Sequence, residues 1–185
     1  MFASLAAATM FCLPAQAPGR VAALDGTQHR PLAEAIGKPV ALIFITHDCP
    51  ICNAYAPELS RIAKAYAKRD VPVELVYTEQ GLSRQDATAH AKSYSYTGMK
   101  LFLDPKGTLA KACGATTTPE AAVYDERGRL IYLGRIDDQY IGFGKQRARV
   151  SSRDLRAALD AALSHQQIAH PRTTAVGCLI TINPS

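Results

Sequence analysis

Hydrophobic and polar positions follow one another along the chain in blocks that fit strands and helices in turn. Residues 40–45 (VALIFI) are all apolar and mostly β-branched or aromatic, which predicts a strand buried on both faces of a sheet. Residues 49–68 then carry apolar side chains at steps of three and four, which predicts an amphipathic helix bent at Pro57. Shorter apolar blocks predict further strands at residues 21–24, 73–76, 99–103, 121–124 and 130–133.

Capping residues delimit the remaining helices. Ser83 is expected to cap a helix that runs to about Tyr94, and Gly114 to end a short helix over residues 109–113. Ser151, with Asp154 three residues later, is expected to cap the last long helix. Strands that alternate with helices and end in a hairpin predict an α/β fold, with a central mixed sheet flanked by helices on both faces.

The length and composition predict one globular domain. The chain has 185 residues, of which 48% are hydrophobic, and this is enough for a sizeable core. The net charge is only +5, and the basic residues are scattered apart from one loop cluster at residues 145–153. A basic stripe with interleaved aromatic residues is missing, so we expect no nucleic-acid binding.

The two ends of the chain differ in character from its centre. Residues 1–17 are uncharged and end in Ala-Gln-Ala, which predicts a secretory signal peptide rather than a membrane span, although a lipid anchor at Cys12 is an alternative. We assign residues 18–165 to the domain and residues 166–185 to a tail docked on it, of which residues 175–182 are apolar enough to form an edge strand. We therefore expect a monomeric extracytoplasmic protein, periplasmic in a bacterium, that does not associate with a membrane after signal cleavage.

Four cysteines remain beyond the expected signal peptide, an even number that suits an oxidising compartment. Cys49 and Cys52 form a CxxC motif directly after the buried strand, and Pro50 opens the following helix. Cys113 and Cys178 can form a second disulfide or remain two separate thiols. A zinc site would need a second local pair of ligands, which these two residues do not provide, so we expect no metal.

A cysteine at a helix N-terminus has chemical consequences. Unpaired N–H groups and the positive end of the helix dipole stabilise a thiolate there. Cys49 is therefore expected at the exposed lip of the site as the nucleophile. Cys52, one turn further along, is expected to resolve the mixed disulfide. The redox-active Cys49–Cys52 disulfide takes the place of a cofactor, and none other is expected.

The Cys-Pro-Ile-Cys motif, with Pro57 five residues after the second cysteine, resembles the active-site helix of the thioredoxin superfamily. Residues 20–163 resemble its redoxin branch, which is related to the alkyl hydroperoxide reductase and thiol-specific antioxidant (AhpC/TSA) family of bacteria. The resemblance implies a thioredoxin-like fold. It also implies a thiol–disulfide oxidoreductase that acts on protein or small-molecule thiols and exchanges electrons with a separate donor or acceptor.

The resemblance also implies a substrate-binding loop opposite the cysteines. In this superfamily the X-Pro peptide before the antiparallel hairpin is cis and faces the CxxC motif, and Thr118-Pro119 holds that place here. Thr118 and Pro119 are thus expected to bind an extended peptide, together with Pro50 and Ile51 between the cysteines.

Thioredoxin carries a buried acidic residue on the central strand, six residues before the first cysteine. This chain has Ile43 at that position. Proton transfer to Cys52 must then use another group or water. His47 and Glu79 are the candidates, and the alternative for each is a solvated loop residue. His90 is expected to be an exposed or core-edge histidine.

Two other functions compete with the exchange activity. Thr46, three residues before Cys49, resembles the threonine of the peroxiredoxin site, which favours an antioxidant peroxidase acting through Cys49. However, Leu42 replaces the expected proline and Arg135 comes one strand too late, so any peroxidase activity should be weak. Copper delivery is the third function, and the two residues between the cysteines, where such proteins have three, argue against it.

One further segment, residues 134–140, resembles a signature of a bacterial redoxin-like subgroup, as does the Gly177-Cys178 ending. Its adjacent acids Asp137 and Asp138 are expected either to hold a loop through Arg135 or to form a partner surface.

Overall fold

The computed structural model describes residues 20–182. The expected signal peptide at residues 1–17, with Cys12, lies outside these residues. Among the helices that the structure describes, none combines the length and apolar character needed to cross a membrane.

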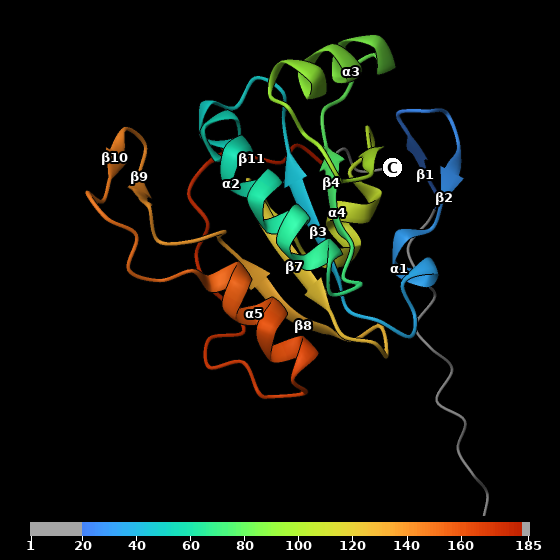
Figure 1. The fold of residues 1–185 in the computed structure, drawn as a ribbon. Coiled ribbons are helices and arrows are strands. Elements are labelled where there is room, and N and C mark those ends of the chain that lie inside the picture. The colour runs from blue at the N-terminus through green and yellow to red at the C-terminus, as the bar shows by residue number, and fades with distance from the viewer. Residues whose placement is uncertain (1–19, 183–185) are drawn as a thin grey trace, which may run out of the picture.

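A mixed seven-stranded sheet forms the centre of the fold, in the order β2-β1-β5-β4-β3-β7-β8 (Figure 1). The three central strands β3, β4 and β5 run parallel, whereas β7 and β8 form an antiparallel hairpin beside β3. The strands are β1 (Val21–Ala23), β2 (Gln28–His29), β3 (Val40–Ile45), β4 (Val73–Tyr77), β5 (Leu101–Leu103), β7 (Glu120–Tyr124) and β8 (Leu130–Gly134).

Helices cover both faces of this sheet, as the sequence predicts. They are α1 (Pro31–Glu34), α2 (Pro50–Ala67), α3 (Arg84–Ser93), α4 (Thr108–Cys113) and α5 (Asp154–Leu163). Apolar residues of α2 and α5 pack with Ile43 and Ile45 on one face, while those of α4 pack with Leu42 and Phe44 on the other. Strand β3 therefore buries all six of its side chains, which explains why its sequence shows no alternation.

The start of α5 differs from the prediction. Arg153, not Ser151, is the N-cap residue, and it makes no side-chain capping bond. The backbone N–H of Ser151 donates to Asp138 at 2.8 Å, and its hydroxyl donates to the same carboxylate. Hydrogen bonds to an ionised carboxylate are stronger than those to a neutral acceptor. Ser151 therefore fixes the loop before α5 to Asp138 and does not cap the helix.

Asp137 and Asp138 of the 134–140 segment fix neighbouring loops and helices in place, but neither of them pairs with Arg135 as expected. Arg135 forms its ion pair with Asp154 of α5, at 2.8 Å. Asp138 binds Arg147, at 3.3 Å, from the loop after the small hairpin of β9 (Tyr140–Gly142) and β10 (Lys145–Gln146). Asp137 accepts a 2.5 Å hydrogen bond from the hydroxyl of Tyr55 in α2.

The C-terminal tail docks on the domain at two places. After α5 it passes along β8, where the Leu133 N–H donates to the Pro171 carbonyl at 3.0 Å. It then crosses to the other end of the sheet, where β11 (Cys178–Leu179) pairs antiparallel with β6 (Thr117–Thr118) (Figure 1). The strand expected over residues 175–182 is thus shorter than expected, and it pairs with β6 in a separate two-stranded sheet.

Glu120 holds the loop that carries β6. Its carboxylate accepts the backbone N–H groups of Thr116 and Thr117 at 2.8 and 3.2 Å, and the residue is 7% exposed. Replacing Glu120 with Ala leaves two N–H groups without their acceptor, so the free energy of unfolding should fall by about 1–3 kcal/mol. Urea unfolding measures this loss. Glu120→Gln keeps one oxygen for the same donors and should lose less, and equal losses in the two variants would contradict this role.

Candidate active site: three thiols and a cis-proline loop

The end of β3 delivers the first cysteine to the mouth of α2. Cys49 is the N-cap residue in an extended conformation, Pro50 is the first helical residue, and the Asn53 N–H bonds to the Cys49 carbonyl at 3.0 Å. Pro50 suits this place because the first turn of a helix leaves its N–H groups unpaired. Cys52 then lies one turn along the same helix, so local backbone geometry brings the two thiols together.

The exposure of the site differs from the prediction. Cys49, expected at an exposed lip, is 0% exposed, and so is Cys52. Of the two intervening residues, Pro50 is exposed, whereas Ile51 packs into the hydrophobic core. The tail explains the burial of Cys49, because it is docked on the loop that faces this thiol.

The facing loop has the predicted geometry. The Thr118-Pro119 peptide bond is cis, and both residues are buried. The Thr118 carbonyl lies 3.5 Å from the Cys49 sulfur. Thr46 joins the site at the end of β3, with its hydroxyl 3.4 Å from that of Thr118.

The tail contributes a third thiol. The Cys178 sulfur lies 3.1 Å from the Cys49 sulfur and donates its hydrogen bond to it. Residue 177 must be glycine for this approach, because a Cβ there would lie 1.9 Å from the Thr118 carbonyl oxygen. Nothing in the local sequence around Cys178 indicates this contact, which joins residues 129 positions apart.

Of the two alternatives for Cys113 and Cys178, a second disulfide or two separate thiols, the structure has the separate thiols. All four described cysteines are free thiols. Cys113 is buried in α4 and interacts with Tyr124, at the opposite end of β7 from the cis-proline. Its thiol therefore behaves as a small apolar core group, whereas Cys178 contacts Cys49.

The environments of the three thiols differ sharply. Hydrogen bonds from Cys52, and to a smaller extent from Cys178, lower the pKa of Cys49 from 9.0 to about 5 despite its burial. Burial and the neighbouring Cys49 raise the pKa of Cys52 well above 9.0, and the same two causes raise the pKa of Cys178 to about 11. At neutral pH Cys49 is thus a thiolate that accepts hydrogen bonds from two neutral thiols.

The Cys178 thiol can be tested as a stabiliser of the Cys49 thiolate. Replacing Cys178 with Ala removes a donor, so the pKa of Cys49 should rise, and its rate of alkylation should reach a plateau at a higher pH. Cys178→Ser keeps a donor and should shift the profile less. The pH dependence of iodoacetamide labelling, read by peptide mass spectrometry, measures both variants. Identical profiles in wild type and Cys178→Ala would contradict the contact.

The two proton-transfer candidates contact one another. The backbone N–H of His47 donates to Glu79 at 2.7 Å, and its ring Nδ1 contacts the same carboxylate oxygen. This hydrogen bond raises the pKa of His47, and burial raises the pKa of Glu79. Asn53 of α2 donates to the His47 carbonyl at 2.9 Å, which ties this pair to the helix that bears both cysteines.

His90 belongs to the same network, which the sequence did not indicate. It is buried, its Nδ1 lies 2.8 Å from the Tyr77 hydroxyl, and its Nε2 lies 2.9 Å from the Asn53 side-chain oxygen. Burial lowers its pKa, so the neutral ring is favoured. Asn53 is thus held between His90 and the loop of His47, where it positions the first turn of α2.

A pocket of about 420 Å³ opens beside the thiols. It is lined by Thr46, Asp48, Thr78, Glu79, Gln80 and the tail residues 178–181. Cys178 is partly exposed and belongs to this lining, whereas Cys49 does not. The pocket therefore leads to the third thiol first.

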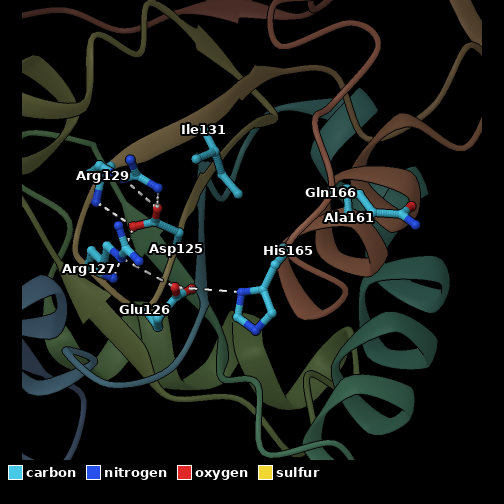
Figure 2. A pocket seen from close by; sticks show the side chains of 9 residues that line it. Asp125, Glu126, Arg127, Arg129, Ile131, Ala161, His165 and Gln166 are labelled. Atoms are coloured by element: carbon cyan, nitrogen blue, oxygen red, sulfur yellow. Dashed lines mark hydrogen bonds and ion pairs between the residues drawn. The ribbon is translucent and has the colours of Figure 1, made fainter.

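A second pocket, of about 450 Å³, lies between the β7–β8 turn and the end of α5 (Figure 2). It opens at the β7–β8 turn, where Asp125 binds Arg129 and Glu126 faces His165 from the end of α5. Because the cis-proline precedes β7 and this turn follows it, the two pockets lie at opposite ends of that strand. No cysteine lines this second pocket.

One group of described residues could hold a metal by distance alone. His47, Asp48 and Glu79 each offer a donor atom within 4.8 Å of the others. The hydrogen bond between His47 and Glu79 already accounts for that proximity. The absence of a metal remains a prediction.

Comparison with solved structures supports the fold. The chain is 26% identical to an uncharacterised conserved protein from Geobacillus kaustophilus, with a TM-score of 0.80 over 96% of this chain and 95% of that one. It is 27% identical to a hypothetical protein from Sinorhizobium meliloti 1021, with a TM-score of 0.78 over 91% and 93% of the two chains.

A third structure carries a functional name. The pneumococcal exposed lipoprotein thioredoxin of Streptococcus pneumoniae is 30% identical, with a TM-score of 0.55 over 63% of this chain and 87% of that one. The architecture is therefore that of the thioredoxin-like fold, as expected.

Comparison with sequence families gives the classification. A curated relative, "Probable nucleoredoxin 1" of Arabidopsis thaliana, is 24% identical over 101 residues, and the matched part is 54% of this chain but only 17% of that protein. The family model AhpC/TSA matches residues 6–133, more than half of the chain. The protein thus belongs to the AhpC/TSA family.

Proposed function

We propose that the protein is a thiol–disulfide oxidoreductase in which Cys49 is the nucleophile and Cys52 the resolving thiol. The observation that carries the proposal is the geometry of the site, in which Cys49 is the N-cap of α2, Cys52 lies one turn further along, and the cis-proline loop faces Cys49. A thiolate is the attacking species in disulfide exchange, and a protonated thiol beside it serves the second step. The cis-proline loop opposite Cys49 offers backbone groups for an extended substrate.

The exchange runs in two balanced steps. The Cys49 thiolate attacks one sulfur of a substrate disulfide, forms a mixed disulfide, and releases the other sulfur as a thiolate. Cys52 then loses its proton and attacks the Cys49 sulfur, which releases the second substrate thiolate and leaves the Cys49–Cys52 disulfide. Because burial keeps Cys52 protonated, the second step needs a base, and we assign this role to the His47–Glu79 pair, acting directly or through water.

The natural substrates in this proposal are thiols or disulfides of proteins or small molecules, and the working compartment is extracytoplasmic. The similarity to an exposed lipoprotein thioredoxin supports the compartment. The even number of cysteines beyond the expected signal peptide also supports an extracytoplasmic compartment.

The acidity of Cys49 predicts the redox poise. Thioredoxin, with a nucleophile pKa near 7, has a potential of about −270 mV, whereas the most oxidising periplasmic enzyme, with a pKa of about 3.5, lies near −120 mV. A pKa of about 5 for Cys49 supports a potential between these two values for this protein. The test of function is reduction of insulin disulfides and oxidation of a reduced dithiol peptide, both by the full chain. Failure in both assays would reject the proposal.

A peroxidase is the second candidate, and the contact of Thr46 with the cis-proline loop favours it. The Thr46 hydroxyl lies 3.4 Å from that of Thr118 and lines the pocket beside the thiols, from which a peroxide would approach. However, Arg135, which comes one strand later than the expected peroxide-site arginine, is bound to Asp154 of α5. We therefore expect hydrogen peroxide to react with Cys49 no faster than with a free thiol of the same pKa. A stopped-flow rate far above that value would favour the peroxidase instead.

A further inference from the structure

The tail lies where an extended substrate would lie. Strand β11 pairs antiparallel with β6, so Cys178 is directly opposite Thr118 and Leu179 opposite Thr117. Gly177 packs against the Thr118 carbonyl so closely that no other residue fits. The tail therefore presents a cysteine to Cys49 through backbone pairing with the cis-proline loop.

The tail is fixed on both sides of this cysteine. Before it, the Thr173 hydroxyl lies 2.6 Å from the Tyr132 hydroxyl on β8. After it, the Ile180 N–H donates to the Thr116 carbonyl at 2.9 Å, and the Ile180 side chain packs against the core. An external disulfide can reach the buried Cys49 only if these contacts break. Cys178, in contrast, already lines an open pocket.

We propose that Cys178 is a third redox-active cysteine, which forms a disulfide with Cys49 and exchanges that disulfide with external partners. This inference rests on the proposed function, because it uses Cys49 as the nucleophile. The two sulfurs are 3.1 Å apart, so a bond between them needs a movement of only about 1 Å. The partner is a solvent-accessible thiol or dithiol, small enough or exposed enough to enter the pocket beside Cys178.

Each step of this relay balances. In the oxidised protein, Cys178 loses its proton and attacks the Cys49 sulfur. The Cys49–Cys52 bond breaks, and Cys52 leaves as a thiolate and takes up a proton, with no net oxidation. A partner thiolate then attacks the Cys178 sulfur and expels Cys49 as a thiolate. A second partner thiol attacks the partner's sulfur in the mixed disulfide, which frees Cys178 and leaves the partner oxidised.

The acidity of Cys49 fits its place as the leaving group. A thiol of low pKa departs faster in disulfide exchange. Attack by an external thiol on the accessible Cys178, with the low-pKa Cys49 expelled, is thus favoured over attack on the buried Cys49.

Disulfide mapping in the full chain tests the relay. A Cys52→Ser variant, which also carries Cys113→Ala, is reduced and then treated with oxidised glutathione. Glutathione first forms a mixed disulfide with a site cysteine, and the second thiol of the 49–178 pair then displaces it. We expect the Cys49–Cys178 disulfide as the main product by mass spectrometry. The same variant with Cys178→Ser should instead accumulate glutathione on Cys49, at least about tenfold more than the parent, because the intramolecular thiol is gone.

Two outcomes would overturn the relay. One is a stable glutathione adduct on Cys49 of the Cys52→Ser variant with Cys178 still a free thiol. The other is equal adduct levels with and without Cys178. If wild type still forms the Cys49–Cys52 disulfide in the same experiment, only the role of Cys178 falls. If wild type forms no disulfide at Cys49 at all, the proposed function falls with it.

Discussion

A Cys49→Ser variant should lose thiol–disulfide exchange activity by about a thousandfold or more, because no other thiol of the site is ionised at neutral pH. Burial alone raises the pKa values of Cys52 and Cys178 above the ordinary value of 9.0, so both thiols stay mainly protonated at neutral pH when Cys49 is absent. Neither can therefore replace Cys49 as the attacking sulfur. Insulin reduction at a fixed concentration of dithiothreitol, with turbidity as the readout, measures the loss.

The chain offers a matched control for this variant. Cys113 is as deeply buried as Cys49 but lies in α4, among the side chains on the other face of the sheet. Cys113→Ser should therefore retain wild-type turnover, and any loss of stability in it can be read from thermal unfolding. Residual activity of Cys49→Ser above a tenth of wild type would mean that another thiol starts the reaction.

A Gly177→Val variant should release the tail and expose Cys49. The added Cβ would meet the Thr118 carbonyl oxygen at 1.9 Å, and this contact is with backbone, which cannot rotate away. The pairing of β11 with β6 must then break, because both partners are held by main-chain bonds. Alkylation of Cys49 by iodoacetamide should become at least about tenfold faster than in wild type, since burial of the thiol in the docked state limits attack to open molecules.

Gly142→Ala is the matched control for the tail variant. A Cβ at residue 142 meets only the Lys145 side chain, at 3.8 Å, which is an ordinary contact. Gly142→Ala should therefore label at the wild-type rate. If Gly177→Val also labels at the wild-type rate and folds normally, the tail does not cover Cys49 in solution.

The sequence predicts the parts of this fold that depend on local pattern. The bounds of β3 follow from an uninterrupted apolar run, and Pro50 marks the start of α2 because a proline fits only the first helical turn. The cis bond before Pro119 follows from its place before the hairpin, once the family is recognised.

The rest depends on contacts between distant residues, which no local pattern contains. Ser151 looked like a helix cap, but the distant carboxylate of Asp138 takes its hydrogen bonds. His90 looked like an ordinary core-edge histidine, but it orients Asn53 of α2. The burial of Cys49 was missed for the same reason, because it depends on a tail that returns to the site from the far end of the chain.

The candidate site combines a predictable part, the CxxC motif, with a part that the sequence does not predict, the contact of a third thiol with that motif. The CxxC spacing alone places Cys49 and Cys52 in one helical turn. The low pKa of Cys49, however, also draws on Cys178, so the reactivity of the motif is only partly encoded in the motif itself.

Equilibration of the full chain with defined ratios of reduced and oxidised glutathione is the most direct measurement. Disulfides are mapped at each ratio by acid quenching and peptide mass spectrometry. A Cys49–Cys52 disulfide should form with a single midpoint between about −270 and −120 mV, as a Cys49 thiolate of intermediate stability requires. If Cys49 and Cys52 both remain thiols at every ratio, or if the midpoint lies below that of thioredoxin, the redox couple assigned to these two cysteines is contradicted.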